Sequence, residues 1–234
     1  MSLFNGNAQS RPQDVLSSSD STSKTLSVVA VENSLVERVY ENLACVYDLT
    51  YGPMLHRGRV QAIERIGIES GDRVLEVGVG TGINTTLYPT DCFVTGIDLS
   101  SSMLERAHTR VARHEIENVR LLKMDAADLR FPDESFDIVY APYLMSVVPD
   151  PIAVEREMRR VCKVGGRIIF LNHFMSQNPV LSKFERLISP LTVHIGFRSD
   201  LDLEVFLVQA DLQPISIEKL SLLKLWSLVT CVKE

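Results

Sequence analysis

From residue 54 onward, the spacing of hydrophobic and polar positions changes repeatedly between two periods. Short apolar runs rich in β-branched residues predict buried strands at residues 73–78, 92–98, 119–124, 136–141 and 166–172. Apolar residues three and four apart predict helices between them at 81–88, 100–114 and 152–162. This alternation indicates parallel strands, because each parallel connection needs a crossover about as long as a helix.

After residue 172 the pattern predicts one more helix at 199–210, with Ser199 or Asp200 as its N-cap. Two final strands, at 215–220 and 225–232, have only a short link between them and should therefore pair antiparallel. The expected fold is α/β: a seven-stranded, mostly parallel sheet with helices on both faces and a C-terminal antiparallel hairpin.

The N-terminal part of the chain has a different composition. Residues 1–25 are polar and serine-rich, which predicts a disordered tail, and residues 26–53 form a lid segment before the main domain at 54–234. The lid segment contains an amphipathic helix at 32–45 that either packs on the domain or covers a ligand site. Because the N-terminus lacks the pattern of a secretory signal, we expect a cytoplasmic protein.

Composition excludes several classes of function. A net charge of −6 argues against a domain that coats nucleic acid, because that affinity comes from Lys and Arg neutralising phosphates. The chain has no run of about 18 apolar residues, so no membrane-spanning helix is expected. Its four cysteines are far apart among apolar neighbours, which indicates buried free thiols rather than a metal site.

A glycine-rich turn carries the first chemical signal. The strand at 73–78 leads through Gly78, Gly80 and Gly82 into a helix, so backbone can turn sharply and approach a ligand. Asp98 ends the next strand, about 20 residues later, where an acidic side chain reaches a ribose diol in nucleotide-binding folds. Together these features predict an adenosine-containing ligand.

The details of the turn narrow the ligand further. A dinucleotide-binding fingerprint requires glycine where this chain has Ile83, and no Gly-Lys-Ser/Thr follows to bind phosphates. Glu76, at the end of the strand, adds a negative charge near the loop. Such a charge opposes a pyrophosphate but suits a cofactor carrying sulfonium and ammonium groups.

Further motifs follow in a fixed order: Glu76 to Gly82, Gly96-Ile97-Asp98-Leu99-Ser100 with Met103, Asp125-Ala126, Phe131 to Asp137, and Gly165-Gly166. In this order they resemble class I S-adenosylmethionine (SAM)-dependent methyltransferases over about residues 40–175. The resemblance implies a Rossmann-like fold, SAM as cofactor and S-adenosylhomocysteine as product.

The resemblance also implies roles for individual residues. It places in the cofactor site Tyr47, Glu76, Gly78, Gly80, Gly82, Asp98, Leu99, Met103, Asp125, Ala126 and Ala141. Asp98 would bind the ribose hydroxyls, Met103 would pack on the adenine, and Asp125 would accept a hydrogen bond from the adenine amine. Alternatively, the two aspartates could be helix caps or surface groups and Met103 an ordinary core residue.

Within the superfamily the chain is similar to bacterial phospholipid N-methyltransferases. The residues that carry this likeness are Tyr40-x-x-x-Ala44-x-x-Tyr47-Asp48, Ala141-Pro142-Tyr143, Ser146 to Pro151, Asn172-His173-Phe174 and Ile195-Gly196-Phe197-Arg198. The likeness implies methylation of phosphatidylethanolamine towards phosphatidylcholine at the inner membrane surface, with no obligate protein partner. Because the tyrosine motif also occurs in quinone C-methyltransferases, a quinone or small-molecule methyltransferase is the alternative, and a non-catalytic SAM-binding module is a second.

Tyr143, Ser146 and His173 follow strand ends, so we expect them to converge on the methyl group of the cofactor. His173 and Tyr143 are the candidate catalytic residues, because an ammonium group must lose a proton before it attacks. A single histidine after a strand is at least as often a structural residue as a catalytic one, so a structural role for His173 is the alternative. Tyr143, Ser146 and Tyr40 are candidate substrate-binding residues.

Arg198 is the candidate ligand for the substrate phosphodiester, although it could instead pair with Asp200 or Asp202. Basic residues are frequent from Arg156 to Arg198. This run could dock on an anionic membrane or form an ordinary solvated helix face.

Overall fold

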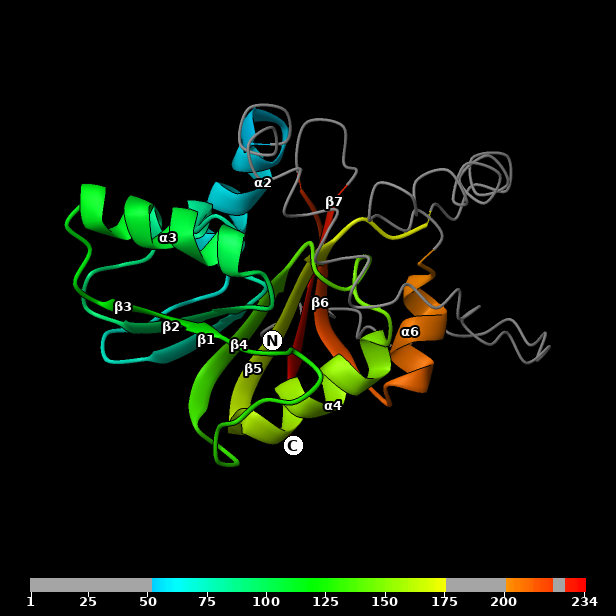
Figure 1. Cartoon of the computed structure of the whole chain (residues 1–234). Coiled ribbons are helices and arrows are strands. Elements are labelled where there is room, and N and C mark those ends of the chain that lie inside the picture. The colour runs from blue at the N-terminus through cyan, green and yellow to red at the C-terminus, as the bar shows by residue number, and fades with distance from the viewer. Residues whose placement is uncertain (1–51, 176–200, 221–225) are drawn as a thin grey trace, which may run out of the picture.

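The computed structural model describes residues 52–175, 201–220 and 226–234 (Figure 1). The elements in chain order are α2 (Gly52–Arg65), β1 (Arg73–Val77), the 3₁₀ turn η2 (Ile83–Thr86), β2 (Phe93–Asp98), α3 (Ser101–Arg113), β3 (Val119–Lys123), β4 (Phe136–Pro142), α4 (Pro151–Val161), β5 (Cys162–Asn172), α6 (Leu203–Gln209), β6 (Pro214–Leu220) and β7 (Trp226–Val232). The predicted tail and the helix at 32–45 lie outside the described residues, and so does the rest of the lid segment except Gly52 and Pro53, which begin α2.

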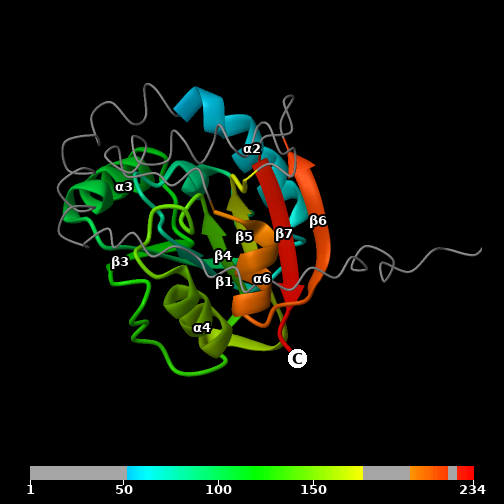
Figure 2. The ribbon, with the colours of Figure 1, turned by 90° about the vertical axis from the view of Figure 1, so that its right-hand side faces the viewer.

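The strands form one seven-stranded sheet in the order β3-β2-β1-β4-β5-β7-β6. Strands β1 to β5 pair in parallel, and β7 pairs antiparallel with both β5 and β6. Figure 2 shows the two C-terminal strands at one edge of the sheet. The predicted mostly parallel α/β sheet with a C-terminal antiparallel pair is therefore confirmed. Strands β2 and β3 follow β1 on one side, and β4 and β5 lie on its other side, so the strand order reverses at β1.

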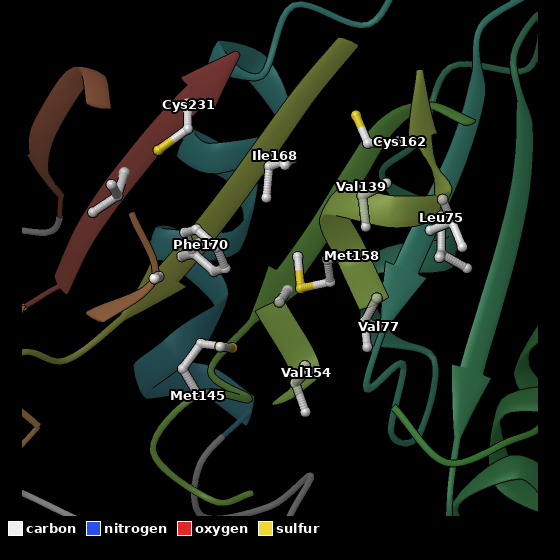
Figure 3. Close-up of a cluster of buried hydrophobic side chains, with 14 of the residues drawn as sticks. Leu75, Val77, Val139, Met145, Val154, Met158, Cys162, Ile168, Phe170 and Cys231 are labelled. Carbon is white, nitrogen blue, oxygen red and sulfur yellow. The ribbon is translucent and has the colours of Figure 1, made fainter. Parts of the chain in front are cut away.

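Helices cover both faces of the sheet (Figure 1). On one face, Ala62 and Ile63 of α2 and Ile66 directly after it belong to a buried cluster with β1, β4, β5 and β7. On the other face, α4 and α6 contribute to a larger cluster, and Figure 3 shows Val154 and Met158 gathered with Phe170 and other strand residues. Successive strand residues point to opposite faces, so the apolar runs predicted as buried strands supply both clusters.

Some predicted elements differ from the structure. Residues 81–88 form only the short 3₁₀ turn η2, because the left-handed Gly82 precedes it and the Thr85 hydroxyl donates to the Gly82 carbonyl at 2.7 Å. Helix α2 was not predicted, since Gly52, Pro53 and Gly58 weaken its helical pattern.

The helix predicted at 199–210 begins later than expected. Its N-cap is Asp202, whose Oδ1 accepts from the backbone N–H groups of Glu204 at 3.0 Å and Val205 at 3.3 Å. Ser199 and Asp200, the predicted caps, precede the described segment.

The described part of the basic run does not form an open cationic surface. Arg159 pairs with Glu155 at 2.9 Å, Lys163 with Asp137 at 2.6 Å and Arg167 with Asp72 at 3.5 Å. The pair of Arg159 and Glu155 lies within α4, whereas Lys163 joins β5 to β4 and Arg167 joins β5 to the residue before β1, so these three cations serve the fold. Among the described residues, no helix combines the length and hydrophobicity needed to span a bilayer.

Arg160 makes the densest set of these contacts. Its guanidinium donates to the carbonyls of Phe131 at 2.8 Å and Leu129 at 2.6 Å, and it also binds Asp133 and Glu157. It therefore ties the segment between β3 and β4 to α4.

We expect Arg160→Ala to lower the free energy of unfolding by about 2 kcal/mol, because it removes charge-assisted hydrogen bonds and leaves two carbonyls without this donor. Chemical denaturation measures the loss. The control is Arg156→Ala, four residues earlier on α4 and exposed, which should change stability by less than about 0.5 kcal/mol. Equal effects of the two substitutions would contradict the assigned role.

Candidate active site

A cavity of about 280 Å³ lies at the carboxyl ends of β1 to β4. Its walls include Gly78 and Gly80 after β1, Asp98 at the end of β2, Asp125 after β3 and Tyr143 after β4. This is the edge of an open parallel sheet where the strand order reverses, the position at which such sheets bind ligands. The volume is close to the lower limit of about 300 Å³ for small-molecule sites.

The glycine loop exposes backbone to the cavity. Gly78 has φ 79° and Gly80 has φ 57°, in the left-handed region that favours glycine. A Cβ at Gly78 would lie 2.8 Å from the Leu144 side chain, whereas a Cβ at Gly80 would meet no atom within 4 Å. Gly82 does not line the cavity; a Cβ there would lie 3.1 Å from the Ala107 Cα, so this glycine permits close packing of the loop on α3.

Asp98 connects the end of β2 to the glycine loop. Its Oδ2 accepts from the Gly80 N–H at 2.8 Å, and its Oδ1 accepts from the Ser100 N–H at 2.9 Å. Burial raises the pKa of this carboxyl, while the backbone donors oppose the shift. Each oxygen has more than one acceptor position, so the carboxylate can hold the loop and also accept from a ligand.

Another part of the cavity wall is an apolar slot with one carboxylate. Leu99, Met103 and Ala126 line it beside Asp125. Asp125 Oδ1 accepts from the Ala127 N–H at 2.9 Å, which fixes the turn after β3. The cavity wall also includes Leu144, Val147, Val148 and Pro149 from the segment between β4 and α4, and Val154 of α4.

Besides Gly82, two further residues predicted for the cofactor site do not line the cavity. Ala141 is fully buried in the cluster under α4 and α6, and its neighbour Pro142 lines the cavity instead. Glu76 is also fully buried: its Oε1 accepts from Asn84 Nδ2 at 2.6 Å and its Oε2 from the Tyr88 hydroxyl at 2.7 Å. Burial raises the pKa of Glu76 to about 7, although the two hydrogen bonds and Arg59 favour its ionised form.

Tyr143 lines the cavity in a strained backbone conformation with φ 60°. The indole of Trp226 packs edge-on against its ring at 4.9 Å, and the Arg59 guanidinium carbon lies 4.9 Å from the ring centroid. A Cβ at Gly58 would lie 2.7 Å from the Tyr143 hydroxyl, so this glycine provides the space that the hydroxyl occupies. Contacts from α2 and β7 therefore determine where the hydroxyl lies.

The expected shared rim of Tyr143, Ser146 and His173 is not formed in the described structure. Ser146 is buried, with its hydroxyl 3.4 Å from Asn172 Oδ1, and His173 packs on Trp226 with ring centroids 6.0 Å apart. Neither lines the cavity. All three follow strand ends, but of the three only Tyr143 lines the cavity. The remaining candidates, Tyr40, Tyr47 and Arg198, lie outside the described residues.

Arg59 is a lining residue that no sequence motif included. It is 6% exposed, and its Nη1 donates to Asn84 Oδ1 at 3.2 Å. The signal that could have found it is a basic residue on the buried side of α2, but the helix itself was not predicted.

The buried Glu76 generates a pH prediction. Its folded-state pKa of about 7 lies above the ordinary value of 4.5, so the folded protein holds this proton more tightly than the unfolded chain. This contribution to stability is complete below about pH 4.5 and is lost as the pH rises through about 7, by about 3 kcal/mol in total.

Glu76→Gln should remove this dependence, because an amide does not titrate. We expect the stability of the variant relative to the wild type to increase between about pH 5 and pH 8 in denaturation curves. Glu64→Gln, an exposed glutamine substitution on α2, is the matched control. A constant difference between Glu76→Gln and wild type across this range would show that Glu76 does not titrate there.

Comparison with known proteins agrees with this site. A family model described as a methyltransferase domain matches residues 75–170. The chain is 41% identical over 175 residues to phosphatidylethanolamine N-methyltransferase of Cereibacter sphaeroides, covering 74% of this chain and 85% of that protein. It is 33% identical over 161 residues to demethylmenaquinone methyltransferase of Staphylococcus aureus, covering 65% of this chain and 64% of that protein.

Among solved structures, a phosphoethanolamine N-methyltransferase 2 of Haemonchus contortus, in complex with S-adenosylhomocysteine, superposes with a TM-score of 0.67. The match covers 86% of this chain and 60% of that one at 17% identity, so it supports the fold. The extent and identity of the sequence matches identify the family, and SAM as the cofactor follows from the family. SAM is an adenosine-containing ligand, as the glycine loop and Asp98 predicted. The chain belongs to the class I SAM-dependent methyltransferases.

Proposed function

We propose that this enzyme transfers methyl groups from SAM to the amine of phosphatidylethanolamine and its methylated forms, towards phosphatidylcholine. The observation that carries the proposal is the 41% identity to a phosphatidylethanolamine N-methyltransferase, which extends over 85% of that protein. The enzyme would work at the membrane surface, where its lipid substrate is found. Its quinone-methylating relative matches at lower identity and over a smaller share of its length.

The lining residues fit SAM chemically. We assign the ribose hydroxyls to the free acceptor positions of Asp98, the adenine to the slot formed by Leu99, Met103 and Ala126, and the adenine amine to Asp125. The open space over Gly80 admits the methionyl part against bare backbone. When bound, SAM supplies an electrophilic methyl group on a sulfonium.

The protein then has to orient the amine and help it lose a proton. A primary ammonium resembling lysine titrates near ~10, so at neutral pH it must be deprotonated before its lone pair can attack carbon. We assign contact with the amine to Tyr143, because this residue lines the cavity and a tyrosine hydroxyl can accept a hydrogen bond. His173 contacts Trp226 rather than the cavity, so the proposal does not give it the amine. Holding the amine in line with the methyl group accounts for much of the rate enhancement in such a transfer.

Incubation with methyl-labelled SAM and liposomes containing phosphatidylethanolamine tests the substrate directly. Label in mono-, di- or trimethylated lipid supports the proposal. Parallel reactions contain demethylmenaquinone or free ethanolamine, and label in one of these alone overturns it. SAM binding without transfer to any acceptor would instead indicate a non-catalytic module.

Asp98→Ala should weaken SAM binding by about 10-fold or more, because it removes the ribose acceptor and the tie to the Gly80 N–H. Isothermal titration calorimetry measures the affinity. Asp91→Ala, an exposed aspartate that precedes the same strand, is the control and should bind SAM as the wild type does. Unchanged affinity in Asp98→Ala would remove Asp98 from the cofactor site.

A further inference from the structure

Trp226 is a buried aromatic residue at the edge of the sheet that carries the cavity. It begins β7, which pairs antiparallel with β5, so its end of the strand lies beside the carboxyl end of β5. The register agrees, because Ser227 is paired with Asn172, the last residue of β5. Trp226 is 9% exposed and does not belong to the cavity wall. The C-terminal hairpin therefore brings a large ring to this edge without lining the cavity.

The Trp226 indole contacts rings from two loops. Its centroid lies 4.9 Å from that of Tyr143, after β4, and the two rings form an angle of 82°. It lies 6.0 Å from that of His173, after β5, with an angle of 81°. Both are edge-to-face arrangements, which aromatic pairs favour. Because the indole is buried and contacts a ring from each loop, packing leaves it little freedom to turn, and it can serve as a fixed support.

Tyr143 requires support of this kind. Its φ of 60° is a left-handed backbone conformation that bulky residues rarely adopt, and such strain persists only where surrounding contacts impose it. The Arg59 guanidinium carbon lies 4.9 Å from the Tyr143 ring centroid, and the Trp226 indole packs on the same ring. Strained residues concentrate at functional sites, and Tyr143 lines the cavity. The strain therefore points to a function that depends on where this ring lies.

Helix α2 leaves space for the same side chain. Gly58 is buried within α2, although glycine is a poor helix former and alanine a good one. A Cβ at this position would lie 2.7 Å from the Tyr143 hydroxyl oxygen and 3.6 Å from Trp226 Cδ1. Because the first distance is shorter than real Cβ contacts, an alanine would displace the hydroxyl. The glycine therefore costs the helix stability and provides room for Tyr143.

We propose that Trp226 and Gly58 are positioning residues for methyl transfer, and this inference rests on the proposed contact of Tyr143 with the amine. Trp226 holds the Tyr143 ring from outside the cavity, and Gly58 leaves room for its hydroxyl. Transfer requires the acceptor and the methyl group to be aligned, and a displacement of ~1 Å can lower a rate about 100-fold. The C-terminal hairpin thereby acts on the rate without contributing a described residue to the cavity wall.

Trp226→Leu should lower kcat about 10-fold or more, because Tyr143 loses the ring that holds it. The affinity for S-adenosylhomocysteine should stay within about 2-fold of the wild type, since the glycine loop and Asp98 are unchanged. Trp226→Phe, which keeps an aromatic edge, should recover most of the rate. Transfer from labelled SAM to phosphatidylethanolamine liposomes measures the first effect and calorimetry the second. Equal rates in the leucine and phenylalanine variants would overturn the proposal.

Leu228→Ala is the matched control. Leu228 lies two residues further along β7 in the same buried cluster, so its truncation disturbs the same packing without removing a ring. It should lower stability and leave kcat unchanged at temperatures where the variant is folded. If it lowers kcat as much as Trp226→Leu does, Trp226 serves the fold and the proposal fails.

Gly58→Ala separates positioning from stability. Alanine favours the helix, so the melting temperature should not fall, whereas the new Cβ should displace the Tyr143 hydroxyl and lower kcat about 10-fold. Thermal unfolding and the transfer assay measure the two effects. An unchanged kcat, or a fall in kcat together with the melting temperature, would remove Gly58 from the proposal.

A double-mutant cycle tests whether Trp226 acts through Tyr143. Trp226→Leu should lower kcat much less in the Tyr143→Phe background than in the wild type, because the hydroxyl that it positions is already absent. Losses that multiply in full would overturn the positioning role. If the wild type labels no phosphatidylethanolamine, the proposed function fails, and the variants are compared on demethylmenaquinone or ethanolamine, whichever accepts label. Wild-type transfer that Trp226→Leu leaves unchanged overturns this proposal alone, and absence of transfer to all three acceptors overturns both.

Trp226 is the only tryptophan in the chain, so its fluorescence reports the ring contact without any acceptor. Tyr143→Leu should shift the emission of the purified, ligand-free chain to longer wavelength, because the indole loses the ring that shields it. Unchanged emission would show that the two rings are not in contact in solution and would overturn the proposal.

Discussion

The site depends on one constraint, the parallel pairing of β1 with β2 on one side and β4 on the other. Parallel neighbours end at the same edge, so the residues after these strands are brought together whatever their separation in sequence. The hydrogen bond from the Gly80 N–H to Asp98 then joins two of those ends directly. The bare glycine backbone and the carboxylate are consequently presented to one ligand with little freedom to separate.

A charged group in the core accompanies this arrangement. Glu76 lies on a central strand, where a nonpolar residue would avoid the cost of desolvation. Tyr88, Asn84 and, through Asn84, Arg59 surround it, so the network extends from the centre of the sheet to the cavity. Burying Glu76 costs stability, and such a cost is typical of a functional site, because carboxylates with shifted pKa values concentrate at binding and catalytic sites.

Basic residues are used in two distinct ways. Arg159 and Arg160 donate to carbonyls that link α4 to neighbouring segments, and Lys163 joins β5 to β4 through Asp137. Arg59 lies at the cavity instead. A run of positive residues in a sequence does not distinguish these uses, because both need the same side chain and only its partners differ.

The periodicity of the sequence was enough to predict the strands of the sheet and most of the helices. Buried strands appear as runs of β-branched residues, and α3 and α4 appear as amphipathic patterns, and both are local properties of the sequence. The glycine motif with Asp98 likewise predicted an adenosine-containing ligand, because the glycines and the acidic residue can be recognised from their spacing in the sequence.

Tertiary structure decided which other side chains lie beside the glycine loop and Asp98. It left Glu76, Ala141 and His173 out of the cavity wall and brought in Arg59 from a helix with a weak pattern. The physical reason is that a side chain's partners come from packing between elements distant in sequence, which no local spacing encodes.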